Sequence, residues 1–389
     1  MGAIGGIVDF KNGNIDFSSF NAVRSAQILR GRMSSVAYCD SGIGMFYNSD
    51  GFFECEQPII SERKGYRTAF VIDSPFFQPK AAIEAYHTYG VELVGMLDTP
   101  FAIALYDGKR RMLLLARDKK GKKPLYYRLK SGRVIFSSEP KGILATEGTA
   151  IRVNNEILSS HLTSPTGIYG AADIYSDIYE VRRGECILFS EIGISKFFYR
   201  ENNHKRLGSK NSAVQRDIAI EPSLFVDKQD ALSSLDDMLI AFDMPQFDSY
   251  MPSVCQLFLY ADNSTAFSFA DYIKRYNIYY SYEREDRMSA FYGKVGVGVM
   301  SRLDEGEVKR LIHEEYKMNI LKALKDAIFS LERSEMLFLR DILGDARLNC
   351  ILKSVNNIKK ENTDDFIRIL GMLYQAVKWS KLRELELVK

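Results

Sequence analysis

The chain has 389 residues, of which 46% are hydrophobic and 26% charged, which is the balance of a core-forming globular protein rather than a disordered one. Its 52 lysines and arginines face 50 aspartates and glutamates, leaving a formal charge of +2. General nucleic-acid binders carry a clear basic excess, so we expect no nucleic-acid partner.

Up to about residue 200 the sequence predicts short β-strands separated by glycine turns. The apolar runs that indicate strands are Gly5–Phe10, Arg67–Ile72, Phe101–Asp107, Met112–Arg117, Leu125–Tyr127 and Val134–Ser138, and Ala81–Tyr89 is expected to form a helix. Gly108 separates one pair of runs and Gly132 another, which is typical of antiparallel hairpins. Because the runs are apolar without alternation, we expect sheets that are covered on both faces.

Residues 201–216 are polar and predict a linker between two domains, 1–200 and 217–389. Beyond the linker, apolar residues recur with helical spacing, which indicates helices over Asp230–Phe242, over Asp304–Ile328 and from Thr363 to Val377. The predicted fold class is therefore α+β, with a β-rich first domain and a mainly helical second one.

Cysteine and histidine usage predicts a reduced protein without a metal site. Five cysteines are widely spaced and form no CxxC pair, namely Cys39, Cys55, Cys186, Cys255 and Cys350. Four histidines are equally scattered, namely His87, His161, His204 and His313. The N-terminus is not that of a signal peptide, and no apolar stretch reaches the roughly 20 residues that span a bilayer. We therefore expect a cytoplasmic protein with no membrane partner.

The most informative segment is Arg117–Tyr127, with the sequence RDKKGKKPLYY. It resembles the RDxxGxxPLYY signature of the class II glutamine amidotransferase domain in asparagine synthetases. Other motifs of that family occur in the same order, at Gly5–Asp9, Gly95–Asp98, Phe101–Asp107, Phe136–Lys141, Val181–Glu185 and Phe197–Tyr199. The resemblance covers nearly all of residues 1–200 and implies an Ntn-hydrolase-like antiparallel β-sandwich flanked by helices.

A weaker resemblance continues past the linker. Ala231–Ser253 is similar to a segment of the ATP-using synthetase domain, which implies that residues 217–389 are a truncated, mainly helical remnant of that domain. The family's SGGxDS pyrophosphate loop and its SGDGGDE loop do not occur in the chain. We therefore predict no ATP site, no metal ligands and no cofactor.

The resemblance also implies a glutaminase site that the residues do not supply. Family members use an N-terminal cysteine, exposed by removal of Met1, as the nucleophile and its α-amine as the base. Position 2 here is Gly2, although a cloned MG start leaves a native cysteine there as an open alternative. The family's Asn-Gly oxyanion donors fall within Val71–Phe77, and its substrate-binding arginine is missing from Gly44–Asn48. The acidic loop that follows is shortened, so we predict no catalytic residues.

Two charged motifs have a functional and a structural interpretation. The lysine-rich segment Lys119–Lys123 either binds phosphate or RNA or forms a solvated hairpin tip, and its place inside the family turn favours the tip. Glu139 and Arg117 are expected to form a structural pair rather than a catalytic one.

Three motifs in the second domain are weighed in the same way. Asp236-Asp237 and Asp262-Asn263 are either remnant metal ligands or helix-capping acids, and the second interpretation is favoured. Gly293–Gly298 has the spacing GxxGxG instead of GxGxxG, which disfavours a dinucleotide loop.

These observations predict a catalytically degenerate, asparagine-synthetase-like pseudoenzyme. It would act as a partner, a scaffold or a ligand- or peptide-binding protein in a biosynthetic pathway. The alternative is an ATP-dependent amide-bond-forming synthetase without glutaminase activity, as in asparagine synthetases, lasso-peptide cyclases and β-lactam synthetases. We expect a protein, peptide or small-molecule partner, and the sequence leaves a homodimer open.

Overall fold

The computed structural model describes residues 2–49, 56–74, 79–146, 151–163, 171–201, 207, 232–233, 235–236, 238–240, 243–245, 314–355, 358, 363–383 and 385–388. Its contacts divide the chain into two compact units. Unit 1 contains Met1–Gly148, Asp177–Val214 and Tyr280–Gly296, and unit 2 contains Thr149–Ser176, Gln215–Tyr279 and Val297–Lys389.

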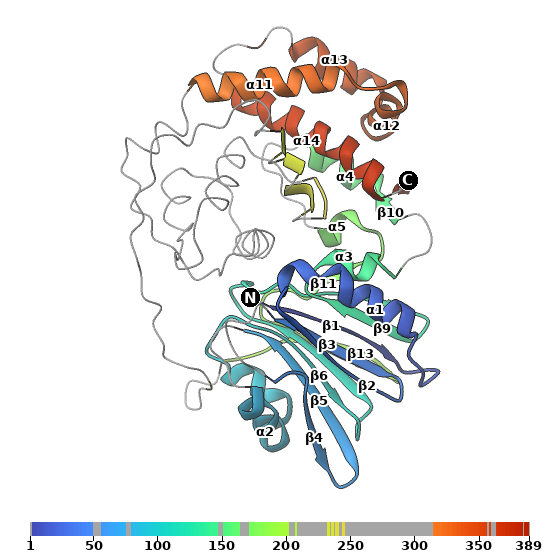
Figure 1. Ribbon diagram of the computed structural model, residues 1–389, viewed down its shortest axis with the longest axis vertical. Helices are drawn as coiled ribbons and strands as arrows, with labels where there is room; N and C mark the ends of the chain where they lie inside the picture. The colour runs from blue at the N-terminus through green and yellow to red at the C-terminus, as the bar shows by residue number, and fades with distance from the viewer. Residues whose placement is uncertain are drawn as a thin grey trace. The chain divides into compact units, whose positions relative to one another are not determined.

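Unit 1 is built on two antiparallel sheets (Figure 1). Sheet A has the strand order β11-β8-β9-β1-β3-β2, formed by β11 (Tyr179–Glu180), β8 (Tyr126–Lys130), β9 (Arg133–Ser137), β1 (Gly2–Asp9), β3 (Ile43–Ser49) and β2 (Ser34–Asp40). Sheet B has the order β13-β12-β7-β6-β5-β4, formed by β13 (Gly193–Phe198), β12 (Glu185–Ser190), β7 (Met112–Arg117), β6 (Ala102–Asp107), β5 (Tyr66–Asp73) and β4 (Ile59–Arg63). The hairpins predicted at Gly108 and Gly132 are the β6–β7 and β8–β9 connections.

The main core of unit 1 lies between the two sheets. Ile4 and Met45 of sheet A and Val71 and Leu115 of sheet B belong to one cluster of fully buried apolar side chains. Successive side chains of a strand point to opposite faces, so the intervening residues of both sheets need a second cover. The runs without alternation in the sequence follow from this double burial.

Helices cover the outer faces of both sheets. They are α1 (Phe17–Ala26), η1 (Ile28–Arg30) and α3 (Pro140–Leu144) beside sheet A, and α2 (Pro79–Tyr89) and η2 (Gly90–Met96) beside sheet B. Asp16 caps α1 by accepting the backbone N–H groups of Ser18 and Ser19, and Phe20 then packs edge-on against Phe46 with ring centroids 5.9 Å apart. The resulting layers of helix, sheet, sheet and helix confirm the expected α+β fold with an antiparallel sandwich.

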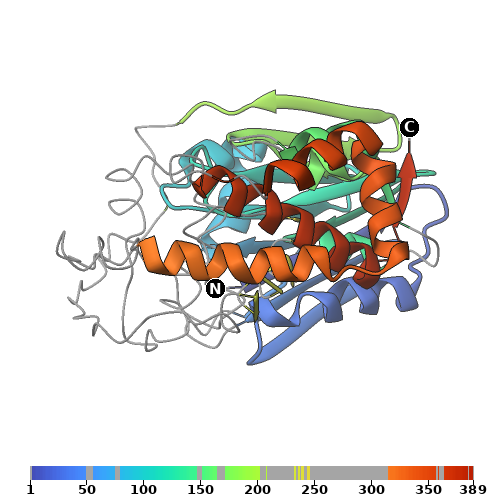
Figure 2. The same cartoon turned by 90° about the horizontal axis from the view of Figure 1, so that it is seen from above.

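Unit 2 is mainly helical (Figure 2). Its described elements are β10 (Ile151–Asn154), α4 (Asn155–Thr163), α5 (Ala171–Ile174), α11 (Glu314–Phe329), α12 (Arg333–Leu343), α13 (Asp345–Val355), α14 (Thr363–Arg383) and β14 (Leu385–Val388). The helix predicted from Thr363 is α14, whose buried residues include Leu370, Leu373 and Val377. Residues 314–328 of the second predicted helix lie in α11, and the described residues between 232 and 240 are helical. None of the helices in the described ranges is long and apolar enough to cross a membrane.

Residues 149–176 belong to unit 2, although the sequence analysis placed them in the first domain. The reason is pairing over a long sequence distance. Strand β10 pairs in parallel with β14, and α4 packs against α14. Tyr175 donates its hydroxyl hydrogen bond to the carbonyl of Asp243, and its ring lies edge-on to Trp379. The helical unit therefore takes one segment from within the β-rich half of the sequence.

Candidate functional site

The start of β1 is held at one end of the sandwich by two neighbouring strands. Gly2 pairs with Ser49 of β3 in the antiparallel register. Two residues further along, the backbone N–H of Ile4 donates to the hydroxyl of Ser138 at 3.0 Å, and the N–H of Ser138 donates to the carbonyl of Ile4 at 2.9 Å. Position 2 is therefore fixed by backbone contacts at the end of the sandwich.

The space that a side chain at position 2 would take is filled by Tyr47. A Cβ atom built on Gly2 would lie 2.5–2.7 Å from three atoms at the far end of the Tyr47 ring. Tyr47 is only 9% exposed and belongs to the core between the sheets. Any residue larger than glycine at position 2 therefore requires this buried ring to move.

A cluster of buried charges lies beside Gly2. The Arg30 guanidinium donates from Nε to the Gly2 carbonyl at 3.1 Å and from Nη2 to the Asp73 carboxylate at 3.1 Å. Its Nη1 lies 3.5 Å from the Glu139 carboxylate. Lys123 Nζ lies 3.5 Å from Asp73, and Lys141 Nζ lies 2.9 Å from Glu139.

Each carboxylate of this ion cluster lies between two cations. The five side chains are 1–8% exposed, so they are screened very little by water. Buried charges persist only when they are paired, and these pairs join η1, the end of β5, the start of α3 and the loop before β8. The chemistry of the cluster is that of charge pairing, because none of its members is a thiol or hydroxyl nucleophile.

Comparisons with known proteins show which family part of the chain resembles. Residues 80–203 match the family described as the glutamine amidotransferase domain. Asparagine synthetase [glutamine-hydrolyzing] 3 of Bacillus subtilis is 31% identical over 117 residues, which are 30% of this chain and 19% of the relative. A protein of Methanocaldococcus jannaschii assigned as asparagine synthetase 2 is 28% identical over 137 residues, 34% of this chain and 27% of the relative. Residues 80–203, most of which lie in unit 1, are therefore similar to the glutamine amidotransferase domain of asparagine synthetases.

The chain spans only a minor part of the curated relatives that it matches. For example, it is 38% identical to amidase chyE of Penicillium rubens over 63 residues, which are 16% of this chain and 9% of the relative. Among solved structures, the glutamine phosphoribosylpyrophosphate amidotransferase of B. subtilis aligns over 77% of this chain and 65% of its own, with 11% identity and a TM-score of 0.34. The likeness to the curated relatives therefore concerns the amidotransferase-like domain and not the whole length of those proteins.

The resemblance described in the sequence analysis implies that two residues of unit 1 stand where the family has catalytic groups. By that resemblance Gly2 would take the place of the cysteine nucleophile. Asp73 is part of the segment that should supply donors to an oxyanion, and its carboxylate accepts from Arg30 instead. A carboxylate accepts hydrogen bonds and donates none, so the Asp73 side chain does not supply a donor to an oxyanion.

The two described cysteines of unit 1, Cys39 and Cys186, do not lie where a nucleophile at position 2 would. Cys186 in β12 is fully buried, and burial raises the pKa of its thiol to about 12. Cys39 lies in β2 five positions beyond Ser34, the residue that pairs with Ser49 opposite Gly2. At ~3.4 Å per residue this places Cys39 ~17 Å along the strand from the site.

The pairing expected between Arg117 and Glu139 is wrong. Arg117 forms an ion pair with Glu180 and donates to the carbonyls of Val181 and Gly121, so it joins the turn before β8 to β11. Glu139 instead pairs with the ion cluster described above. The sequence did not predict this ion cluster because the charged residues that form it lie in separate motifs. The one signal for it was the occurrence of charged residues within strongly apolar segments.

The lysine-rich segment is not a hairpin tip, although Lys119 and Lys120 are exposed as expected. It connects β7 of sheet B to β8 of sheet A, and Lys123 is buried at 6% exposure against Asp73. Gly121 has φ +63°, and a Cβ there would lie 2.4 Å from Arg183, so the turn requires glycine. The Asp118 carboxylate shapes the turn by accepting the backbone N–H groups of the lysines at positions 120, 122 and 123 at 3.0–3.2 Å.

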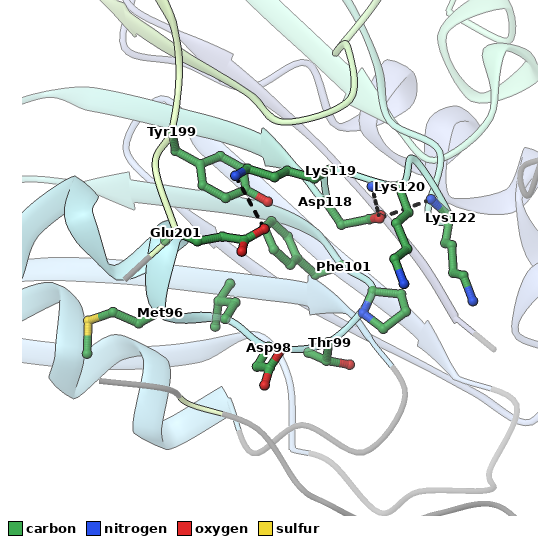
Figure 3. Close-up of a pocket in the computed structure, with 13 residues that line it drawn as sticks. Met96, Asp98, Thr99, Phe101, Asp118, Lys119, Lys120, Lys122, Tyr199 and Glu201 are labelled. Carbon is green, nitrogen blue, oxygen red and sulfur yellow. Dashed lines mark hydrogen bonds and ion pairs between the residues drawn. The ribbon is translucent and has the colours of Figure 1, made fainter. Parts of the chain in front are cut away.

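A cavity of about 280 Å³ lies beside this turn, at one end of sheet B (Figure 3). Its walls are formed by residues 95–101, 118–120, 122, 199 and 201. Lys119 Nζ pairs with Glu201 at 3.3 Å and lies 5.7 Å from the centre of the Tyr199 ring. Burial, followed by the nearby charge of Asp118, raises the pKa of Tyr199, so its hydroxyl stays protonated at neutral pH.

The remaining motifs of the sequence analysis add no described site. Asp236 lies 3.9 Å from Lys378, and burial raises the pKa of its carboxyl group. The segments Asp262-Asn263 and Gly293–Gly298 lie outside the described residues. Within the described ranges, no group of three or more histidine, cysteine or acidic side chains lies close enough together to hold a metal ion.

Proposed function

We propose that the chain is a catalytically degenerate member of the amidotransferase-like family, without glutaminase activity. The observation that supports this most directly is the Tyr47 ring in the space of a side chain at position 2. Loss of a nucleophile alone is a single substitution, whereas the Tyr47 ring beside position 2 and the carboxylate of Asp73 are further departures in the same place.

The proposed role is binding rather than turnover. A fold that keeps its core but has no nucleophile at position 2 still has a surface that can bind. It can act as a partner or scaffold in a biosynthetic pathway, or it can bind a peptide or a small molecule there. We propose that the protein acts in the cytoplasm. A homodimer is a further possibility, which sedimentation of the purified chain tests.

Glutamine hydrolysis by the purified full chain tests the loss of glutaminase activity. We expect no release of glutamate from wild type and none from Gly2→Cys, because the Tyr47 ring still fills the site. The double variant Gly2→Cys with Tyr47→Leu controls for the ring, and mass spectrometry of each protein establishes whether Met1 has been removed. Glutamate release by wild-type protein, abolished by thiol alkylation, would overturn the proposal.

A second candidate function is an ATP-dependent amide ligase without glutaminase activity. It is favoured by the relatives' description as asparagine synthetases and by the weaker resemblance of Ala231–Ser253 to a synthetase segment. Calorimetric titration with ATP and Mg²⁺ separates the two, with thermal melting alongside, since a ligand at 100 times its dissociation constant stabilises a fold by ~2.7 kcal/mol. A saturable signal would favour the ligase, and its absence the binding protein. The third alternative, a native cysteine at position 2, is decided by the second codon of the gene.

A further inference from the structure

We propose that β13, the edge strand of sheet B, pairs with β13 of a second copy of this chain and so forms a homodimer. The proposal names the surface of the homodimer considered above, and it does not depend on the loss of glutaminase activity. β13 is the terminal strand of its sheet, and among the strands that the structure describes none pairs with its outer side. Figure 2 shows it as the long yellow-green arrow at the border of the sandwich.

The face of β13 that points toward the core between the sheets is left uncovered. In the antiparallel register Ile194 lies opposite Phe189, which belongs to that core. Lys196 lies opposite Ile187, another residue of the same core. Residues opposite each other in a sheet share a face and side chains alternate, so Ile194, Lys196 and Phe198 all face the core side. Ile194 is nevertheless 45% exposed and Phe198 64%.

Sheet A ends too early to cover this face. Its last strand there, β11, has two residues. Tyr179 of β11 lies opposite the core residue Tyr127 with ring centroids 5.4 Å apart, yet it is 49% exposed. Leu129 lies opposite the core residue Val134 and is exposed as well. Both sheets therefore present core-facing apolar side chains on this side of the sandwich, and we call the four of them the open flank: Leu129, Tyr179, Ile194 and Phe198.

Lys196 lies between the two sheets and does not protect the strand. Its ammonium donates to the Tyr127 hydroxyl at 2.7 Å and lies 5.4 Å from the centre of that ring. Natural edge strands are protected from pairing by prolines, bulges and charged side chains. β13 contains no proline, and Lys196, its only charged residue, is directed to sheet A. The edge is therefore open to a further strand.

The backbone of β13 offers donors and acceptors to such a strand. The N–H of Tyr199 donates to the Gly184 carbonyl at 3.1 Å, next to the end of β12. Because the direction of the N–H and C=O groups alternates along a strand, those of Ile194, Lys196 and Phe198 point away from β12. The occupant that satisfies these groups and covers the open flank is an extended strand with apolar side chains.

A second β13 has this character and is complementary to the first. When the two strands run antiparallel with Ser195 opposite Ser195, Ile194 of each copy lies opposite Lys196 of the other, so outward-facing backbone groups meet. Phe198 then lies next to the exposed turn residue Ile192 of the other copy. A register centred on Lys196 would place two like charges opposite each other, which is destabilising. The two-fold axis also places both open flanks on the same side of the joined sheet.

Sedimentation velocity of the full chain between about 1 and 200 μM tests the proposal. We expect a reversible dimer with a Kd below about 100 μM. Ile194→Lys and Phe198→Ser should each weaken the dimer by at least about 10-fold, because each change acts twice across the two-fold axis and removes buried apolar surface. Both side chains are exposed in the single chain, so the melting temperature of each dilute variant should stay within about 2 °C of wild type.

Val36→Lys is the matched control, since Val36 is an exposed apolar residue of β2, the edge strand of sheet A. It should leave the dimer unchanged. A protein that stays monomeric up to about 200 μM overturns the proposal and leaves the open flank to a strand of another protein. A dimer that withstands both Ile194→Lys and Phe198→Ser, or that is lost equally in the control, overturns it as well.

Ser195→Cys tests the register directly. A residue opposite itself in a non-hydrogen-bonded pair has Cα atoms ~4.5 Å apart, which a disulfide can bridge. Oxidation of the variant with copper phenanthroline should therefore give a covalent dimer on a non-reducing gel. Wild type treated in the same way controls for the exposed Cys39 and Cys350. A dimer in solution without this cross-link would contradict the proposed pairing, whereas the glutaminase assay is independent of either result.

Discussion

Replacing Arg30 by methionine should destabilise unit 1 strongly. Methionine is of similar length but removes the guanidinium that contacts Gly2, Asp73 and Glu139. Removing one partner of a buried ion pair costs about 3–5 kcal/mol, and the lower end applies because each carboxylate keeps one lysine. The lost hydrogen bond to the Gly2 carbonyl adds about 1 kcal/mol. The free energy of unfolding should therefore fall by about 4 kcal/mol.

Urea denaturation and thermal melting of Arg30→Met measure this loss. For a unit of about 150–250 residues, each kcal/mol lowers the melting temperature by about 2–4 °C, so the expected fall is about 8–16 °C. Arg63→Met is the matched control, since its pair with Glu84 is more than half exposed and should contribute less than about 1 kcal/mol. A loss below about 1 kcal/mol for Arg30→Met, or an equal loss in the control, would refute the reasoning.

Three further predictions concern single contacts of unit 1. Gly2→Ala should lower the free energy of unfolding by about 1–3 kcal/mol, because its Cβ meets the Tyr47 ring, and an unchanged chemical denaturation midpoint would contradict this. Asp16→Ala should cost about 1 kcal/mol at pH 7 by removing the cap of α1. Hydrogen bonds from Ser19 lower the pKa of Asp16, so the cap stabilises the fold at pH values above the ordinary carboxylate pKa. The difference in melting temperature between wild type and Asp16→Ala should therefore shrink below about pH 4. Cys186 should resist iodoacetamide in the native protein and react after unfolding, as followed by peptide mass spectrometry, since burial raises the pKa of its thiol to about 12.

Local patterns were enough to predict the framework of unit 1. The strands around Phe101–Asp107 and Met112–Arg117 and the hairpin between them depend on an apolar run, a glycine turn and a second run, all within a short segment. The helix from Thr363 was equally predictable from its spacing. The segment Thr149–Ser176 was not, because its place in unit 2 depends on pairing with β14, which is far away in sequence.

The lysine-rich turn shows how a pattern with two interpretations is decided. Five consecutive residues, four of them lysines, predict a solvated tip, since lysine is rarely buried. The turn passes from one sheet to the other, and this crossover carries Lys123 inside to Asp73 while Lys120 and Lys122 stay at the cavity. Burial of a lysine follows from the position of its partner, and sequence spacing does not contain that position.

The amino-acid sequence alone was enough to predict the antiparallel hairpins and to find the family motif, with glycine at position 2 of this chain. These features follow from residue identity and from short apolar runs separated by glycine turns, which are local properties. Only the tertiary structure decided that Tyr47 fills the space beside Gly2 and that Arg30 joins two carboxylates there. Arg30 and Asp73 are 43 positions apart, and their contact exists only because strand register and packing between layers bring η1 and the end of β5 together.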